Sequence, residues 1–188
     1  MIVASTIVAM EKLTQYNPQK VIDLLTERLT FERNGVKLYD AIIDKMSLSN
    51  DDNVARMIEQ MQEYRDEEKE HEEWLEDQVR ALGGDTEQLT EMAELVMRES
   101  KGIDDVVLDG DNDVFHLLHA LLTAELADNA GWDLLVALAD EAGDRDAKKA
   151  FKSRLHDEEE HLAFVRRAVE RLARREVLGE EVALPTSP

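Results

Sequence analysis

Apolar residues recur three and four positions apart along most of the chain, which is the spacing of one face of an α-helix. The first such stripe follows Asn17 and Pro18, a cap residue and a first-turn residue that are typical of a helix start. Glycines interrupt the pattern at positions 83–84 and 143, as they do at helix ends. The pattern predicts four long helices, over about residues 18–47, 52–82, 113–141 and 146–178.

The second and third predicted helices are joined by a connection of roughly thirty residues, which is long for a compact domain. Residues 86–99 have a helix-like pattern, whereas Lys101-Gly102 and the polar cluster 109–113 interrupt it. A crossover between two helix hairpins explains such a length. The order hairpin, long crossover with a short helix, hairpin is a known topology of four-helix bundles.

The two ends of the chain differ from the bundle segment, residues 18–178. Residues 1–10 are apolar and lack a basic start, and the run stops at Glu11 and Lys12, too soon to span a bilayer. We expect residues 1–17 to form a docking segment with a short helix. We expect residues 179–188, which end in Leu-Pro-Thr-Ser-Pro, to form a flexible tail.

Composition supports an all-α fold and narrows the possible partners. Aromatic residues make up only 5% of the 188 residues, Gly and Pro are few, and no sustained Val/Ile/Thr alternation indicates a strand. The net charge of -21 disfavours binding to nucleic acid or to an anionic membrane, and it attracts cations. We expect a cytoplasmic location. The absence of Cys excludes thiolate metal sites and iron–sulfur clusters, so a metal would need oxygen and imidazole ligands.

Two segments carry Glu-x-x-His, which places a carboxylate and an imidazole on one helix face. One motif alone is weak evidence in so acidic a chain. An offset of 90 residues, however, superposes Glu68 on Glu158 and His71 on His161. The same offset also aligns the apolar pairs Trp74 with Phe164, Val79 with Val169, and Leu82 with Leu172. The sequence therefore contains an internal repeat.

The first and third predicted helices also repeat, at an offset of 93 residues. Glu32 aligns with Glu125, and Tyr39 aligns with Trp132 two turns further on. Both glutamates interrupt apolar stripes, where an unpaired carboxylate is costly. The chain thus supplies one core glutamate from each of two helices and Glu-x-x-His from the other two. That is a ligand set of two-metal carboxylate bundles.

With this set the sequence resembles the ferritin-like superfamily, and within it rubrerythrin-like and bacterioferritin-like proteins, over about residues 18–175. The resemblance implies two iron ions, with manganese as an alternative. Glu68 and Glu158 would bridge the metals, Glu32 and Glu125 would be terminal ligands, and each histidine would supply one nitrogen; the six implied ligands are Glu32, Glu68, His71, Glu125, Glu158 and His161.

Asp128 lies three residues after Glu125, a spacing comparable to that of an extra carboxylate in rubrerythrin-like sites, and Gly35 occupies the comparable place in the first helix. We therefore consider Asp128 both as an extra ligand and as a polar residue near the bundle wall. Other polar residues are expected to be structural. Glu72, Glu73, Glu76, Glu159, Glu160 and His156 are expected on the surface, His116 and His119 in packing or capping, and Tyr39, Tyr64 and Trp132 as core fillers.

The resemblance implies an oxidoreductase of the ferroxidase or peroxidase type, which oxidises Fe(II) with O2 or H2O2 in iron handling or oxidative-stress defence. Three other hypotheses remain open. The chain could store iron or be the cargo of a protein shell that its C-terminal tail contacts, it could be a di-manganese catalase-like enzyme, or it could be a metal-free structural bundle. We also expect a homo-oligomer, a dimer or larger.

Overall fold

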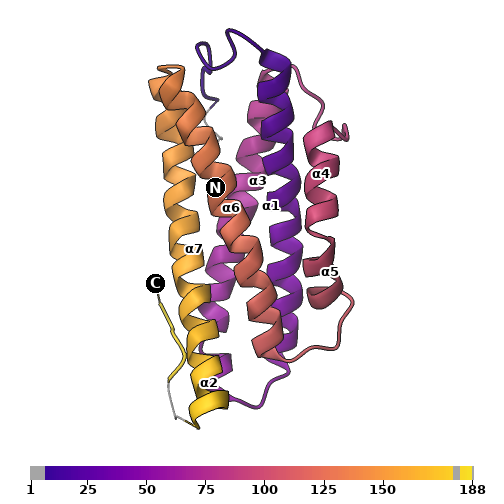
Figure 1. Ribbon diagram of the computed structural model, residues 1–188, viewed down its shortest axis with the longest axis vertical. Helices are drawn as coiled ribbons and strands as arrows, with labels where there is room; N and C mark the ends of the chain where they lie inside the picture. Colours follow the sequence, from indigo (N-terminus) through magenta and orange to yellow (C-terminus); the bar gives the residue numbers. More distant parts are fainter. Residues whose placement is uncertain (1–6, 180–182, 188) are drawn as a thin grey trace, which may run out of the picture.

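The computed structural model describes residues 7–179 and 183–187, and four long helices dominate it (Figure 1). Helix α1 packs against α3 as one antiparallel hairpin, and α6 packs against α7 as a second. The bounds of these helices are Pro18–Ser47 for α1, Ile58–Ala81 for α3, Val114–Glu141 for α6 and Arg145–Leu178 for α7. The predicted all-α, ferritin-like bundle of two hairpins joined by a long crossover is confirmed.

The start of α1 and the end of α3 lie where the sequence pattern predicts them. The side chain of Asn17 accepts a hydrogen bond from the backbone N–H of Lys20, and Pro18 occupies the first turn of α1. Gly83 has φ of 83°, a left-handed conformation that a residue with a side chain adopts only with strain, and it follows the end of α3.

Two details of the predicted helices were wrong. The second predicted helix is interrupted, because α2 (Asp52–Ala55) ends before α3 begins at Ile58. Between them the N–H of Met57 donates to the carbonyl of Val54, a turn tighter than the α-helix, and this turn places both apolar side chains in the core.

The crossover contains two short helices instead of one, α4 (Glu91–Glu99) and α5 (Lys101–Val107). Gly102 does not end a helix, because α5 begins one residue before it. The break falls at Ser100, whose carbonyl accepts from both Ile103 and Asp104 as the second helix begins. Both helices lie along the outer side of α1 (Figure 1).

The apolar core consists of two clusters along the bundle axis. One cluster takes in the C-terminal half of α1, the N-terminal parts of α3 and α6, and the C-terminal half of α7. The other takes in the opposite halves of the same helices, including Trp74, Trp132 and Phe151. Each long helix therefore passes through both clusters, and the stretch between them is the place left for buried polar side chains.

The described part of the N-terminal segment docks on the bundle without a helix. Residues 7–10 have no regular structure and residues 11–16 form turns, while residues 1–6 of the predicted docking helix lie outside the described residues. The N–H groups of Lys12 and Leu13 donate to Asp144, and that of Val8 donates to Gln78. Backbone hydrogen bonds and the buried Met10 thus attach this segment.

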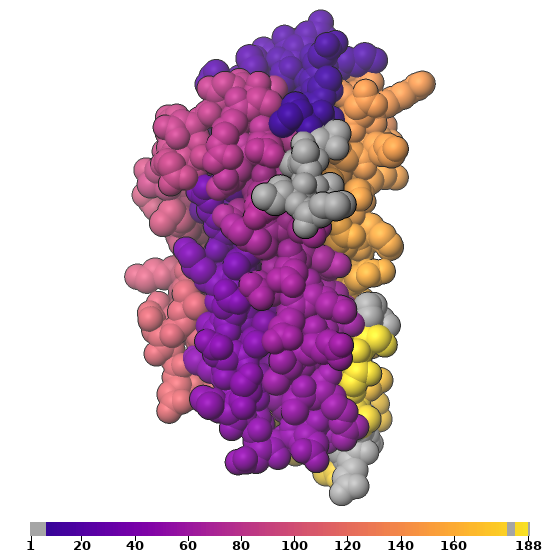
Figure 2. All heavy atoms as spheres, turned by 180° about the vertical axis from the view of Figure 1, so that it is seen from behind, coloured from indigo at the N-terminus to yellow at the C-terminus, as the bar shows by residue number. Residues whose placement is uncertain are grey.

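At the other end, the described tail residues 183–187 contact α7. Leu184 is buried, and Arg171 and Arg167 donate to the carbonyls of Ala183 and Ser187. The tail is visible from behind, at the lower end of the molecule (Figure 2). Within the described residues, no helix has the length and apolar character that a membrane span requires.

Asp144 connects the N-terminal segment to α7, so its replacement tests this attachment. Its carboxylate accepts from the N–H groups of Lys12, Leu13 and Ala147. Asp144→Ala removes a helix cap and leaves two further donors without their partner. We expect the free energy of unfolding to fall by about 2–3 kcal/mol in urea denaturation.

The matched control is Asp113→Ala, which removes the cap of α6 and an exposed ion pair with His116 but no contact with the N-terminal segment. A loss of about 1 kcal/mol is expected there. Equal losses in the two variants would contradict the docking role of Asp144.

Candidate metal centre

The six residues singled out in the sequence meet between the two apolar clusters. Each is at most 3% exposed, although all six are ionisable. Helices α1 and α6 contribute one residue each, and α3 and α7 contribute two each; the residues are Glu32, Glu68, His71, Glu125, Glu158 and His161.

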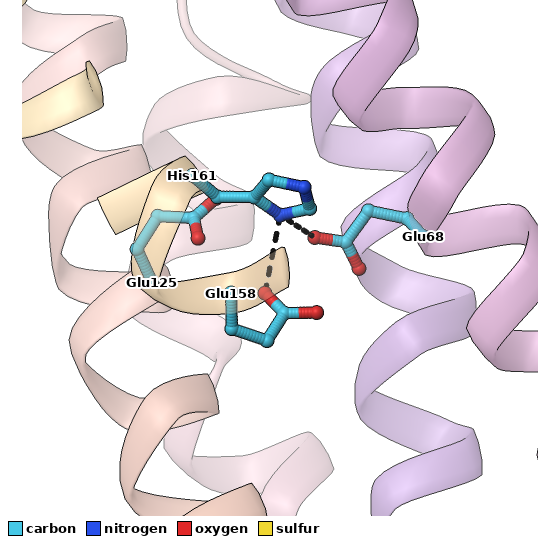
Figure 3. Close-up of side chains that lie close together, drawn as sticks. All are labelled: Glu68, Glu125, Glu158 and His161. Carbon is cyan, nitrogen blue, oxygen red and sulfur yellow. Dashed lines mark hydrogen bonds and ion pairs between the residues drawn. The ribbon is translucent and has the colours of Figure 1, made fainter. Parts of the chain in front are cut away.

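Half of the cluster surrounds His161 (Figure 3). Its Nδ1 lies 3.1 Å from Glu158 Oε2 and 3.5 Å from Glu68 Oε1. Glu125 completes the group, in which one potential ligand atom of each residue lies within 4.8 Å of the others. Three carboxylates and one imidazole from three helices therefore face a common space.

The other half surrounds His71, whose Nδ1 lies 2.8 Å from Glu158 Oε1 and 3.6 Å from Glu32 Oε2. These three residues form a second group of potential ligands. Glu158 belongs to both groups and directs one oxygen toward each histidine. A third group joins Glu68 to Glu32, Glu158 and Asp128. Glu158 and Glu68 are therefore the carboxylates placed between the two halves, which is the arrangement expected of bridging ligands.

Both histidines are held from behind by acidic residues that the sequence analysis missed. His71 Nε2 lies 3.3 Å from Asp157 of α7, and His161 Nε2 lies 2.8 Å from Glu67 of α3. Such a carboxylate favours a ring proton on Nε2 and leaves Nδ1 free to bind a metal. The repeat contained the signal, because the offset of 90 residues also aligns Glu67 with Asp157.

Two aromatic side chains donate hydrogen bonds to the terminal glutamates. Tyr39 Oη donates to Glu125 at 2.6 Å, and Trp132 Nε1 donates to Glu32 at 2.9 Å. Both side chains are fully buried within the apolar clusters, as expected of core residues, and each also donates to the glutamate of the other hairpin. Tyr64 does pack as a filler, with its ring centroid 5.4 Å from that of Phe164.

Asp128 reaches the cluster but is already paired. Its Oδ1 accepts from Arg28 Nη1 at 2.5 Å, and both side chains are 2% exposed. Glu27 binds the other side of the same guanidinium through two hydrogen bonds. Burial opposes the charge of Arg28, but these carboxylates outweigh it and raise its pKa. A Cβ atom at Gly131 would overlap the guanidinium, so this glycine makes room for Arg28.

Gly35 has a comparable steric role. A Cβ atom there would lie 2.6 Å from Glu68 Oε2, closer than such atoms approach. The glycine noted in the sequence therefore provides space for a carboxylate placed between the two halves.

Several buried polar atoms have no partner in hydrogen-bond geometry, and most of them lie in the cluster. Five belong to the six residues: Glu32 Oε2, Glu68 Oε2, His71 Nδ1, Glu125 Oε2 and Glu158 Oε1. His71 Nδ1 and Glu158 Oε1 lie 2.8 Å apart, a contact that is an ion pair only when the histidine is protonated. Buried unpaired polar atoms are costly, and each of these is a potential metal ligand. Four carboxylates balance the charge of two divalent cations. Oxygen and imidazole nitrogen suit iron or manganese, so the residues fit a two-metal site.

Burial and the charges of neighbouring residues shift the pKa values of the carboxyl groups in the cluster. Burial raises the pKa of Glu125 to about 8, and the charge of Glu158 adds to this effect against that of His161. Burial and the charges of Glu158 and Glu32 likewise raise the pKa of Glu68. Glu158 differs, because His161 and His71 outweigh burial and lower its pKa to about 2. Without a metal, the cluster therefore retains protons.

The remaining polar residues lie where the sequence predicted. Asp113 caps the backbone N–H of His116, and the rings of His116 and His119 contact Phe115. His156 is exposed and lies beside Glu159 and Glu160. The acidic residues of α3 outside the cluster are exposed or partly exposed, and several of them form ion pairs, among them Glu72 with Lys69 and Glu76 with Arg80.

These shifts predict how pH acts on the metal-free protein. A group whose pKa is raised on folding stabilises the fold at low pH, and this contribution is lost as pH rises through its folded pKa. For Glu125 that window runs from 4.5 to about 8. Above pH 5 Glu158 is ionised in both the folded and the unfolded protein, so it does not make the free energy of unfolding depend on pH there. We expect the free energy of unfolding in chelator to fall by on the order of 3 kcal/mol between pH 5 and 8.

Urea denaturation followed by circular dichroism measures this trend. Glu125→Gln is the matched variant, because it removes one of the titrating groups and should make the profile less steep. A stability that rises from pH 5 to 8 in the metal-free protein would contradict the assignment.

Comparison with known proteins agrees with this geometry. The family model described as Rubrerythrin matches residues 23–169, a span that includes all six residues of the cluster. A search of curated proteins found no match, and neither did a search of solved structures. The matched span covers most of the chain and most of both hairpins, so this protein belongs to the rubrerythrin family, within the ferritin-like di-iron carboxylate superfamily.

Proposed function

We propose that this protein is a di-iron carboxylate oxidoreductase that oxidises Fe(II) with O2 or H2O2, in iron handling or oxidative-stress defence, in the cytoplasm. The observation that carries the proposal is the group of five buried ligand atoms that lack a hydrogen bond, between two matched histidine-centred halves. A metal-free structural bundle would retain the cost of these unpaired atoms without compensation.

In this proposal Glu68 and Glu158 would be shared between two metal positions, Glu32 and Glu125 would each hold one, and His71 and His161 would bind through Nδ1. Two iron ions held there would supply the two electrons that reduction of O2 or peroxide requires. Because Fe(II) is also the substrate, the protein's strong negative charge favours its approach.

The surrounding residues prepare the ligands. Tyr39 and Trp132 each occupy one oxygen of a terminal glutamate and leave the other oxygen to face the cluster. Glu67 and Asp157 hold the histidine rings so that Nδ1 points inward. The two apolar clusters keep bulk water away from either end. The ligands are therefore oriented before a metal binds.

The amino-acid composition limits which groups could supply the electrons for the proposed reaction. The chain has no Cys, so it lacks the thiolates of a rubredoxin-type iron site. Fe(II) itself or a separate reductant would supply the electrons. The described tail residues contact α7 of their own chain, so the proposal does not include a shell partner.

The first prediction concerns Glu158, which faces both histidines. After anaerobic loading with Fe(II) and desalting, we expect two irons per chain in the wild type and at most one in Glu158→Gln. Oxidation of Fe(II) by O2 should slow by at least about 100-fold in the variant, because a bridging carboxylate is lost. Iron content is measured by inductively coupled plasma spectrometry, and oxidation by stopped-flow absorbance.

Glu159→Gln is the matched control, since it makes the same chemical change one residue away at an exposed position. It should retain two irons and the wild-type rate. If Glu158→Gln also retained both, the assigned site would be wrong.

The second prediction concerns Asp128. Because Arg28 already binds its carboxylate, we propose that Asp128 is a structural partner and not a metal ligand. Asp128→Asn keeps a hydrogen-bond acceptor for Arg28, so we expect two irons per chain. Arg28→Met leaves two acidic residues without their cation, and we expect a loss of about 3–5 kcal/mol in the free energy of unfolding.

Comparing the two variants separates the roles. Loss of one iron in Asp128→Asn, with stability unchanged, would show that Asp128 is a ligand and would contradict this assignment.

A further inference from the structure

The two halves of the candidate metal centre are related by the internal repeat, so they can be compared position by position. An offset of 90 residues exchanges α3 with α7, and the contacts behind the histidines follow it. Glu67 of α3 lies beside His161, and its counterpart Asp157 of α7 lies beside His71. A difference between two equivalent positions therefore identifies a property that only one half possesses.

The repeat places residues of different charge at one of these positions, Tyr64 in α3 and Arg154 in α7. The ring centroid of Tyr64 lies 5.4 Å from that of Phe164, and the guanidinium of Arg154 lies 3.9 Å from the ring centroid of Trp74. Phe164 and Trp74 are themselves equivalent in the repeat. The two side chains therefore occupy equivalent places, one in each half, but only Arg154 is a cation.

The acidic surroundings of these two positions are matched and do not compensate for the difference. The carboxylates whose charges act on the two side chains are equivalent in the repeat: Glu67 and Glu160 near Tyr64, Asp157 and Glu70 near Arg154. The two halves thus have similar negative charge behind their histidines. The positive charge of Arg154 is present in one half alone.

Arg154 lies near the His71 half and is not neutralised by an ion pair. One guanidinium nitrogen donates to the carbonyl of Ala150, and Nε is buried without a hydrogen bond. Within the part of the chain that the structure describes, no carboxylate forms an ion pair with it. Burial lowers the pKa of Arg154, and the negative charges around it, that of Glu32 included, oppose this effect. Its charge therefore acts on a residue of the group around His71.

Two other arginines lie near the centre, and neither removes this difference. Arg28 lies beside the same half, but Asp128 and Glu27 each form an ion pair with its guanidinium. Arg167 lies near Tyr64 of the other half, but it is directed to the tail, where it donates to the carbonyl of Ser187. Among these three described arginines, Arg154 is therefore the one whose charge no ion pair compensates.

The potential ligands are also brought together more completely around His161. Three carboxylates lie in its group, those of Glu68, Glu125 and Glu158. The group around His71 contains two carboxylates, one of which, Glu158, is shared. Because more negative charge attracts a divalent cation more strongly, the ligand sets and the position of Arg154 favour the same half.

We propose that the two halves bind cations in a fixed order, the His161 half first, and that Arg154 makes the His71 half the weaker one. This proposal rests on the metal centre of the proposed function. Repulsion by a nearby unit charge lowers the affinity for a divalent ion, so the two dissociation constants should differ by at least about 10-fold. The weaker half exchanges its ion with solution more readily, and it therefore receives Fe(II) as the substrate.

The order of filling has its own reporter in this chain. A weaker second step does not identify the order, since two cations that share carboxylates repel each other whichever binds first. Both tryptophans, however, lie in the His71 half. Trp132 donates to Glu32 and its ring lies 5.8 Å from that of His71, while Trp74 lies 6.3 Å from Trp132. Tryptophan emission therefore indicates when this half is filled.

Anaerobic titration with Co²⁺, followed by calorimetry and by tryptophan emission, tests the order. In the wild type we expect two ions per chain, with the emission changing mainly on addition of the second equivalent. His71→Gln should retain the tight step, because it leaves the other half intact. His161→Gln should lose the tight step and retain weak binding.

Variants of Arg154 test what makes the His71 half weaker. Arg154→Gln should tighten the second step by at least about 10-fold and leave the first unchanged, whereas Arg154→Lys, which retains the charge, should resemble the wild type. Lys152→Gln is the matched control, since it removes the same charge two residues away at an exposed position, and it should change neither constant. Circular dichroism confirms that each variant is folded.

The exchange variant, Tyr64→Arg with Arg154→Tyr, keeps the net composition and moves the cation to the other half. Its tryptophan emission should change on addition of the first equivalent of Co²⁺, because the His71 half then fills first. This reversal would not follow if Arg154 had only a packing role against Trp74.

Three outcomes would contradict the proposal, and they differ in what else they affect. Wild-type emission that changes equally with both equivalents, or mainly with the first, would overturn the order. Arg154→Gln with wild-type constants would overturn the role of Arg154. In both cases two bound ions would still support the proposed function. A wild type that binds no Co²⁺ would contradict the metal centre itself, and both proposals would fail together.

Discussion

Four carboxylates buried within a few ångströms of one another impose the main constraint on this structure. Glu32, Glu68, Glu125 and Glu158 cannot all be ionised in an apolar interior unless positive charge compensates them. Two histidines provide part of that charge, and retained protons provide part of the remainder, as the pKa of about 8 for Glu125 indicates. The rest of the bundle positions these groups between two apolar clusters that hold the helices in register.

The sequence alone identified the fold and the six central residues because both leave periodic signals. Helical spacing and glycines mark the long helices, and a repeat of Glu-x-x-His marks the cluster. The offset that aligned Glu68 with Glu158 also aligns Glu67 with Asp157, so the outer carboxylates could have been found by the same comparison. They were missed because one more acidic residue attracts no notice in a chain with 43 of them.

Other features could not be predicted, because they depend on contacts between distant segments. The repeat placed Tyr39 and Trp132 near the glutamates, but only the structure shows that each donates to the glutamate of the other hairpin. The pairing of Arg28 with Asp128 joins residues 100 positions apart and has no local pattern. The interruption at Met57 also follows from burial, since a continuous helix would have been equally consistent with the sequence.

The contacts of the cluster have a consequence for how the protein assembles. The side-chain bonds of Tyr39, Trp132 and Arg28, and those from both histidine Nε2 atoms, cross from one hairpin to the other. A hairpin folded alone would therefore carry its acidic residues in water, with none of these partners. Docking of the two hairpins is the step that dehydrates the carboxylates, so a divalent cation that the cluster bound at that moment would act on folding itself. If the cluster binds metal as proposed, the supply of metal during synthesis would then affect how fast the chain folds.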